Sequence, residues 1–252
     1  MADIESSLQK SIPDYITFVG DGEPTLSSDL GRFLRECKSR WAVPVAVITN
    51  GSLLFRPEVR ESLMEADVVM PSLDAADEKT FRRINRPHRG LEFAEIVEGL
   101  RSFRESFPGT IRLEVMLVEN VNDSIAHLQA LKSHIMTINP DLVDISIPTR
   151  PPAERWVNPP SPERIIFAQK LLGGTGVMTS PENGAFGLAN FGSVLEAIEQ
   201  LSSRHPLRLE QAREIERLFA KPGQLNRLIA DGKLRKAEYR GEMFVLPLET
   251  GK

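Results

Sequence analysis

The stretch Tyr15-Ile16-Thr17-Phe18-Val19-Gly20-Asp21-Gly22-Glu23-Pro24-Thr25 decides the predicted fold, because an apolar run ends directly in a loop of glycine, acid and proline. The glycines let the backbone turn sharply and approach a ligand closely, and Pro24 fixes the direction in which the chain leaves. Glu23 adds an anionic acceptor, which suits a cationic or amine-bearing ligand. The alternative is an ordinary strand-to-helix turn, in which Glu23 only favours the start of the next helix.

Short apolar runs rich in Val and Ile predict buried strands that alternate with amphipathic helices. The predicted strands are 15–20, 44–49, 67–72, 111–118 and 142–147, with a short sixth near Val177 and Met178. Apolar stripes predict helices at 30–41, 93–103 and 124–136, and Ser161-Pro162-Glu163 predicts the start of another. This alternation indicates an α/β fold with a parallel sheet, either open or curved toward a barrel.

The first residues predict the end of a helix. Ile4, Leu8 and Ile12 are spaced by four, so they share one helix face that leads into strand 15–20. A further strand is expected before that helix, because strand 15–20 would otherwise leave an apolar sheet edge without a partner. We therefore expect a domain that lacks its first strand–helix unit.

Polar residues follow the next two strands at the point where each ends. Thr49-Asn50-Gly51 closes strand 44–49, and Ser72-Leu73-Asp74 closes strand 67–72. Parallel strands end on one rim of the sheet, so these groups and the Gly20–Pro24 loop are expected to reach a single ligand. Each segment taken alone also fits a simple turn.

Strand 111–118 places Arg112, Glu114 and Met116 on the face opposite its aliphatic residues. In a parallel sheet covered on both sides that second face is also buried, and a buried Glu has to be paired. A polar-lined cleft accounts for Glu114. The alternative is a structural salt bridge from Glu114 to Arg112, Arg83 or Arg86.

These segments resemble the radical S-adenosylmethionine superfamily, of the iron–sulfur oxidoreductase type. The resemblance covers roughly residues 10–175. The matching motifs are Gly22-Glu23-Pro24, Thr49-Asn50-Gly51, Ser72-Leu73-Asp74 and Arg83-Ile84-Asn85-Arg86-Pro87. The resemblance implies a partial (β/α) barrel in which Gly22, Glu23 and Pro24 contact the methionyl amine of S-adenosylmethionine. It implies contacts to the ribose and carboxylate from Thr49, Asn50, Ser72, Asp74 and Glu114. The Gly-Glu-Pro-Thr-Leu spelling and the Asn-Arg-Pro segment also resemble the wyosine-type tRNA-modifying branch.

By the same resemblance an intact protein would cleave S-adenosylmethionine reductively at a [4Fe–4S] cluster, giving a 5′-deoxyadenosyl radical for modification of RNA or another substrate. This sequence departs from that pattern. Asp21 stands where the motif has its first glycine, and the three cluster-binding cysteines are missing. The one cysteine, Cys37, lies on an apolar helix stripe and is predicted to be a buried hydrophobe rather than a ligand. We expect an N-terminally truncated chain that holds no metal and is inactive alone, so whether it is an enzyme stays open.

The C-terminal part follows a different pattern, and the predicted domains are a barrel at 1–175, a linker at 176–193 and a winged-helix-like α+β domain at 194–252. Helices are expected at 194–203, 209–219 and 222–231, and strands at 235–239 and 243–246. Lys and Arg outnumber Asp and Glu from His205 onward, and the reverse holds before it. A basic winged helix indicates a nucleic-acid partner; the alternative is a wing that docks protein or is purely structural.

Composition and absent motifs limit the remaining function classes. The chain has 252 residues, 41% hydrophobic and 26% charged, with a net charge of −4. No apolar run approaches the roughly 20 residues of a membrane span, and the N-terminus is too polar for a secretory signal, so a cytoplasmic protein without a membrane partner is expected. Hydrolase, NTPase and dinucleotide motifs are missing. The contrasting function is a non-catalytic ligand-binding module with a DNA-binding winged helix, that is, a regulator.

Overall fold

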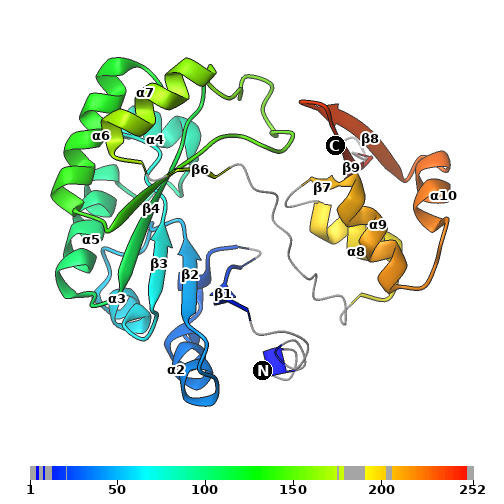
Figure 1. Cartoon of the computed structure of the whole chain (residues 1–252), viewed down its shortest axis with the longest axis horizontal. Coiled ribbons are helices and arrows are strands. Elements are labelled where there is room, and N and C mark those ends of the chain that lie inside the picture. The colour runs from blue at the N-terminus through cyan, green and yellow to red at the C-terminus, as the bar shows by residue number, and fades with distance from the viewer. Residues whose placement is uncertain are drawn as a thin grey trace. The chain divides into compact units, whose positions relative to one another are not determined.

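The computed structural model describes residues 4, 5, 8, 13–20, 22–174, 176–178, 191–202 and 206–248. The chain divides into two compact units. Unit 1 holds Met1–Pro148 and Trp156–Thr179, and unit 2 holds Thr149–Arg155 and Ser180–Lys252 (Figure 1). The predicted boundaries of barrel, linker and C-terminal domain stay predictions, and most of the linker, like Ile12 and Asp21, lies outside the described residues.

Unit 1 is built on a six-stranded parallel sheet. The strands are β1 (Ile16–Phe18), β2 (Val45–Thr49), β3 (Val68–Pro71), β4 (Thr110–Met116), β5 (Leu142–Ser146) and β6 (Gly176–Met178). Their spatial order is the chain order, β1-β2-β3-β4-β5-β6, and every pair is parallel. Each crossover therefore adds a strand on the same side, as in a (β/α) barrel. Within the described residues β1 has one neighbour, β2, and forms an edge of the sheet.

Helical segments connect these strands: η1 (Pro24–Leu26), α2 (Leu30–Arg40), α3 (Pro57–Leu63), α4 (Glu78–Ile84), α5 (Phe93–Ser106), α6 (Ile125–Ile138) and α7 (Pro162–Leu172). The predicted start of α7 is confirmed, because Ser161 accepts a hydrogen bond from the Arg164 N–H and Pro162 takes the first helical position. The short helices α3 and α4 were not predicted. Local signals for them existed, since Pro57 opens α3 and Asp77 caps α4 through the Thr80 N–H.

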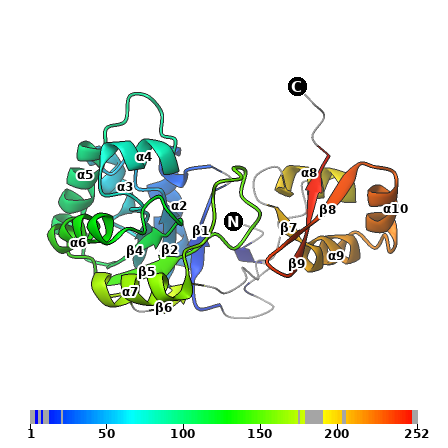
Figure 2. The ribbon, with the colours of Figure 1, turned by 90° about the horizontal axis from the view of Figure 1, so that it is seen from above.

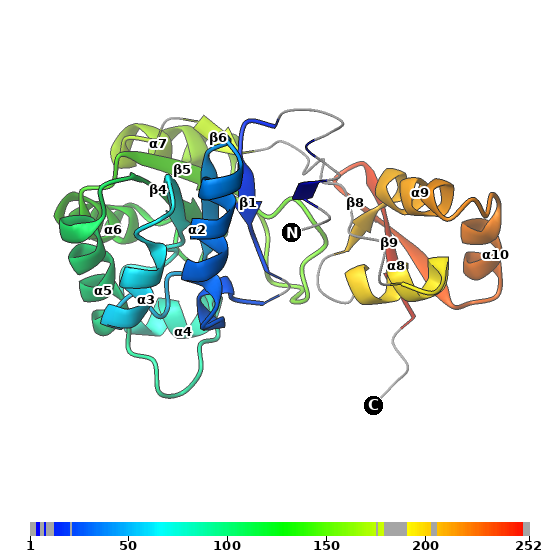
Figure 3. The ribbon, with the colours of Figure 1, turned by 90° about the horizontal axis from the view of Figure 1, so that it is seen from below.

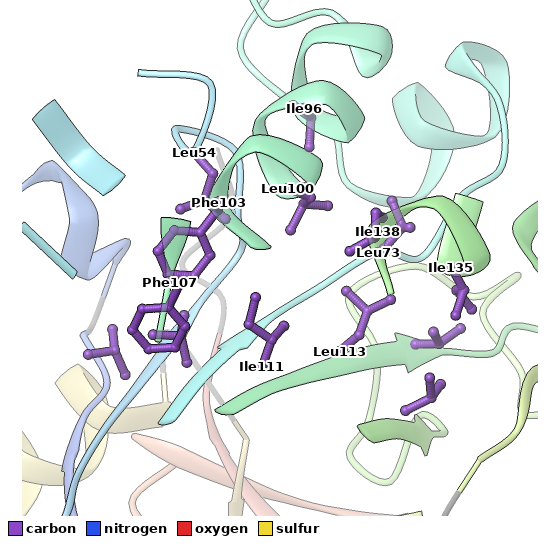
Figure 4. Packing of buried hydrophobic residues seen from close by; sticks show 14 of the residues in the cluster. Leu54, Leu73, Ile96, Leu100, Phe103, Phe107, Ile111, Leu113, Ile135 and Ile138 are labelled. Carbon is purple, nitrogen blue, oxygen red and sulfur yellow. The ribbon is translucent and has the colours of Figure 1, made fainter. Parts of the chain in front are cut away.

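The main core of unit 1 lies between the sheet and the helices on its outer side (Figures 1 and 2). Figure 4 shows Phe103 and Phe107 of the α5 region beside Ile111 and Leu113 of β4, and the two rings stack at 4.6 Å. Cys37 is fully buried in this core, as predicted, and burial raises the pKa of its thiol. Ile4 and Leu8 also pack against this core.

Strand β4 corrects one expectation. Its aliphatic residues are buried, as predicted, but Arg112, Glu114 and Met116 are half-buried rather than covered. The reason is that the described helices pack against the outer face of the sheet, whereas the side chains on the inner face of β4 keep part of their surface exposed. A Glu in that position keeps access to water and does not require a buried partner.

Unit 2 contains α8 (Val194–Ser202), β7 (Leu207–Arg208), α9 (Leu209–Leu218), α10 (Gln224–Ala230), β8 (Leu234–Tyr239) and β9 (Glu242–Pro247). The three strands form an antiparallel sheet in the order β7-β9-β8, packed on its own apolar core (Figure 3). Arg240 and Gly241, with φ of 54° and 81°, form the two-residue turn between β8 and β9. The three predicted helices and two predicted strands are present; β7 was missed because two residues give no periodicity. None of the described helices in either unit is both long and apolar enough to cross a bilayer.

Candidate functional site

Glu23, directly after β1, is the centre of a hydrogen-bonded cluster at the carboxyl ends of β1 and β2. Its Oε1 accepts from the Thr25 N–H at 3.1 Å and from the Thr25 hydroxyl at 2.7 Å. The same oxygen accepts from the Thr49 hydroxyl at 2.5 Å, and Oε2 accepts from the Asn50 N–H at 2.7 Å. The carboxylate therefore links the Gly22–Pro24 loop to the end of β2, and its predicted contact with a ligand stays a prediction.

The end of β2 is shaped by Thr49, Asn50 and Gly51. Thr49 is 2% exposed, and its hydroxyl also accepts from the Gly51 N–H at 3.1 Å. Asn50 is exposed, and its Oδ1 accepts from the Ser52 N–H at 2.9 Å. Gly51 needs its left-handed φ of 71°, and a Cβ added there would lie 3.4 Å from Pro71 at the end of β3. This turn thus brings the first two strand ends close to the third.

A second cluster joins the ends of β3 and β4 through Asp74. Its Oδ1 accepts from the Met116 N–H at 2.8 Å, and its Oδ2 accepts from the Asn85 side-chain amide at 2.9 Å. Burial, together with the neighbouring Glu114 charge, raises the pKa of Asp74 to about 6, although the two hydrogen bonds act in the opposite direction. Asp74 is 7% exposed, so its main role is to connect the ends of the two strands by hydrogen bonds.

Ser72 and Glu114 lie side by side as a parallel bridge pair, and the Leu73 N–H donates to the Glu114 carbonyl at 2.9 Å. The salt bridge considered for Glu114 is absent among the described residues. Arg112 instead donates two hydrogen bonds, of 2.9 and 3.1 Å, to the Asp144 carboxylate of β5. Glu114 thus presents a half-buried carboxylate to the interior of the barrel without an ion-pair partner in the described part of the chain.

Three buried or half-buried side chains that support this site were not found from the sequence. The Asn122 side-chain amide, fully buried, donates to the carbonyls of Asp74 and Met116. His127 accepts from the Ala76 N–H at 3.1 Å, and His134 lies 3.1 Å from the Ala76 carbonyl. Burial lowers the pKa of His127, which favours the neutral ring that this acceptor role requires. No local pattern links them to the end of β3, because their partners Asp74 and Ala76 are 48 to 58 residues away.

The predicted site residues therefore lie at four adjacent strand ends, in two hydrogen-bonded clusters. The first contains Glu23, Thr49 and Asn50, and the second contains Asp74, with Ser72 and Glu114 paired beside it. Gly22 is exposed, and a Cβ added there would meet no protein atom within 4 Å. A ligand can approach its backbone directly. Within the described residues no group of His, Cys, Asp and Glu is placed to hold a metal ion.

Comparison with known proteins identifies the family to which this chain is related. The family model of the Radical SAM superfamily matches residues 7–131. A UPF0026 protein of Methanocaldococcus jannaschii is 32% identical over 246 residues, which are 92% of this chain and 74% of the relative. A UPF0026 protein of Helicobacter pylori strain J99 is 36% identical over 139 residues, covering 55% of this chain and 45% of the relative. The chain thus spans three quarters of one relative and less than half of the other.

The fold has a solved counterpart. A radical SAM methyltransferase from Sphaerobacter thermophilus superposes with a TM-score of 0.54 at 19% identity, over 70% of this chain and 54% of that one. At that identity the match concerns the fold alone. The family model and the relative from Methanocaldococcus jannaschii carry the assignment further. The chain belongs to the radical S-adenosylmethionine superfamily, as a homologue of the UPF0026 proteins.

Proposed function

We propose that this chain binds S-adenosylmethionine at the rim formed by the ends of β1 to β4. The observation that carries the proposal is the Glu23 cluster. Four hydrogen bonds occupy the Glu23 carboxylate and hold the loop in place before any ligand arrives. A loop fixed in this way loses little conformational freedom on binding. The backbone of Gly22, exposed and facing open space, is then the surface that meets the ligand.

The chemistry of the rim suits this ligand. S-adenosylmethionine carries an ammonium and a sulfonium group, and carbonyl oxygens of the Gly22–Pro24 loop are acceptors for the ammonium. Glu114 adds an anion that the protein itself does not pair in its described part, and Ser72 adds a hydroxyl beside it. A carboxylate and a hydroxyl are suited to hold the ribose hydroxyls. Thr49 and Asp74, which are buried and hydrogen-bonded, position the strand ends instead of touching the ligand.

The [4Fe–4S] cluster that the superfamily implies does not fit these residues. Such clusters are held by several cysteine thiolates, and the sequence has one cysteine, fully buried in the core. Burial raises the pKa of Cys37, which opposes the thiolate form that a ligand needs. We therefore assign to these residues the binding and orientation of S-adenosylmethionine, whose sulfonium is the reactive centre, and no reductive step.

Calorimetric titration of the chain with S-adenosylmethionine tests the proposal. We expect saturable one-site binding. Glu23→Gln replaces one acceptor oxygen by a donor, so either the Asn50 N–H or the threonines lose their partner and the loop loosens. We expect this variant to bind about tenfold more weakly, as the loss of one charge-assisted hydrogen bond predicts. Glu119→Gln, in the turn after β4, is the matched control and should bind as the wild type does. Absence of heat with the wild-type chain would overturn the assignment.

We propose nucleic-acid binding by unit 2 as a second function. The order helix, strand, helix, helix and hairpin, with sheet order β7-β9-β8, supports the proposal because a winged helix is expected to have this order. Lys233, Arg235, Lys236 and Arg240 of its hairpin are all exposed. We expect duplex DNA to bind with an affinity that falls as salt rises, and Arg235→Gln with Lys236→Gln to weaken it. If the affinity for DNA changed neither with salt nor with these substitutions, the wing would have a structural or protein-docking role.

A further inference from the structure

A cationic segment borders the proposed site of unit 1. Residues 79–91, which lie between Glu78 and Glu92 in α4 and the loop after it, include five basic side chains and no acid, although the chain as a whole has a net charge of −4. The five are Lys79, Arg82, Arg83, Arg86 and Arg89. Figure 2 shows the connection between α4 and α5 projecting from the body of unit 1. A concentration of positive charge on an acidic protein indicates an anionic partner.

The ends of the cationic segment are fixed in place. Arg82 bonds to Glu78 at 2.5 Å and donates to the Leu91 carbonyl at 2.7 Å. The second oxygen of Glu78 accepts from the Phe93 N–H at 2.7 Å, so the two ends of the loop are joined. Arg82 is therefore a structural cation. The arginines farther along are carried on a loop that is already ordered, which reduces the entropy lost when they bind a partner.

Arg83 forms an exposed stack with Trp156. Its guanidinium lies 4.8 Å from the centre of the indole ring, and within the described residues neither Arg83 nor Arg89 makes an ion pair. Trp156 is half-buried on the connection between β5 and α7. The Glu119 N–H holds that connection by donating to the Asn158 carbonyl at 2.8 Å. The result is a planar, cationic and partly apolar surface, the kind on which nucleobases stack.

This surface adjoins the proposed ligand rim. Asn85, in the middle of the cationic segment, donates to Asp74 at the end of β3. Ser72, two residues earlier than Asp74, is paired with Glu114 inside the barrel. A polymer bound along residues 83–89 therefore passes the strand ends at which the small ligand is proposed to sit.

We propose that the cationic segment and Trp156 bind a single-stranded nucleic acid, with Arg83 and Arg89 on its phosphates and a base on the Trp156 stack. An acidic peptide would satisfy the charge but would leave the planar surface unused, whereas a nucleotide strand carries both phosphates and aromatic faces. The inference rests on the proposed function in one respect, since it names the substrate class for that rim. Binding of the strand itself requires no S-adenosylmethionine.

Fluorescence anisotropy with a short labelled single-stranded RNA, and with DNA of the same sequence, tests the proposal on the full chain between about 50 and 200 mM salt. We expect Arg83→Gln with Arg89→Gln to weaken binding about tenfold or more and to reduce the salt slope by about 1.4, that is, about 0.7 for each lost phosphate contact. Trp156→Leu should weaken binding roughly 5- to 100-fold with the salt slope unchanged, because stacking is not ionic. Trp156→Phe keeps an aromatic face and should retain most of the affinity.

The matched control is Arg40→Gln with Arg101→Gln, which removes the same charge from exposed positions on α2 and α5. All variants are also compared in the Arg235→Gln, Lys236→Gln background, so that unit 2 does not mask the result. Equal loss in the control pair, or no loss in either test variant, would overturn the proposal. A preference for RNA or for DNA would identify the kind of strand, and tighter binding of either nucleic acid supports the proposal. S-adenosylmethionine titration of the Arg83/Arg89 variant tests the rim separately.

Discussion

Gly22 and Glu23 divide the work of the proposed site between backbone and side chain. The sequence correctly predicted that both would lie at the end of the first strand, but it assigned the Glu23 carboxylate to the ligand. Its four protein partners come from the loop itself and from β2, 26 and 27 residues further along the chain. A single sequence does not reveal such partners, since they depend on how the two strands are placed in space.

Gly22→Ala separates ligand binding from folding at this position. A Cβ there meets no protein atom within 4 Å, so the free energy of unfolding should change by less than about 1 kcal/mol. The same methyl group stands where the ligand is proposed to approach, and we expect at least a tenfold loss of S-adenosylmethionine affinity by calorimetry. Full affinity in a normally folded variant would place the ligand elsewhere.

Asp74 gives the site a pH dependence of known sign. Its pKa is raised from 3.8 to about 6 in the folded state, mainly by burial, so the folded protein holds this proton more tightly than the unfolded chain does. The contribution of protonated Asp74 to the free energy of unfolding is therefore complete below pH 3.8 and is lost as the pH rises to about 6. Asp74→Asn cannot titrate and removes this contribution.

Urea denaturation of wild type and Asp74→Asn across pH measures that contribution. The stability of the wild type relative to the variant should fall by about 2–3 kcal/mol between pH 3.5 and 7, since one pKa unit corresponds to about 1.4 kcal/mol. Asp29→Asn, an exposed carboxylate, is the control and should show no comparable fall. If the difference in the free energy of unfolding between wild type and Asp74→Asn stayed constant with pH, this would contradict a buried, destabilised charge at Asp74.

Among the elements, α5 approaches the loop between β2 and α3 closely at Gly99. A Cβ on Gly99 would lie 2.3 Å from the Phe55 nitrogen and 2.6 Å from the Leu54 carbonyl carbon, both backbone atoms. Figure 4 shows Leu54, which precedes Phe55, close to Leu100 and Phe103 of α5. Glycine lets the helix approach a turn that leads away from Thr49 and Asn50, so the helix helps to place the site.

Gly99→Ala should therefore destabilise unit 1 although alanine favours helices. We expect a loss of about 2–3 kcal/mol in thermal or chemical denaturation, because overpacking against backbone exceeds the roughly 1 kcal/mol gained in helix propensity. Ala94→Gly, on the exposed side of the same helix, is the control and should cost only about 1 kcal/mol. A neutral or stabilising Gly99→Ala would show that the two elements separate easily.

Elements were predictable from sequence where a pattern was long enough to repeat. The strands of unit 1 follow from short apolar runs, and helices such as α5 and α6 follow from apolar periodicity. Helices α3 and α4, seven residues each, are too short to establish a stripe, and β7 has only two residues. The half-exposure of Glu114 was also missed, because periodicity gives the face of a strand but does not say what covers it.

At the scale of the whole molecule, two units with separate cores divide the proposed functions. Unit 1 has the superfamily fold and the proposed ligand rim, and unit 2 has the antiparallel sheet with its exposed basic hairpin. The sequence pattern changes after residue 194, and the domain boundaries placed on that change stay predictions. The path of residues 156–160 across unit 1 was not anticipated, since prolines suppress periodicity and its anchors, Glu119 and Arg83, lie far away in sequence.

Hydrogen–deuterium exchange of the full chain, with and without saturating S-adenosylmethionine, would locate the bound ligand on the chain. We expect slower exchange of backbone amides at the four strand ends, in 22–26, 49–52, 72–76 and 114–118, with the hairpin of β8 and β9 unchanged. Slower exchange confined to unit 2, or no difference anywhere in the presence of saturating ligand, would contradict it.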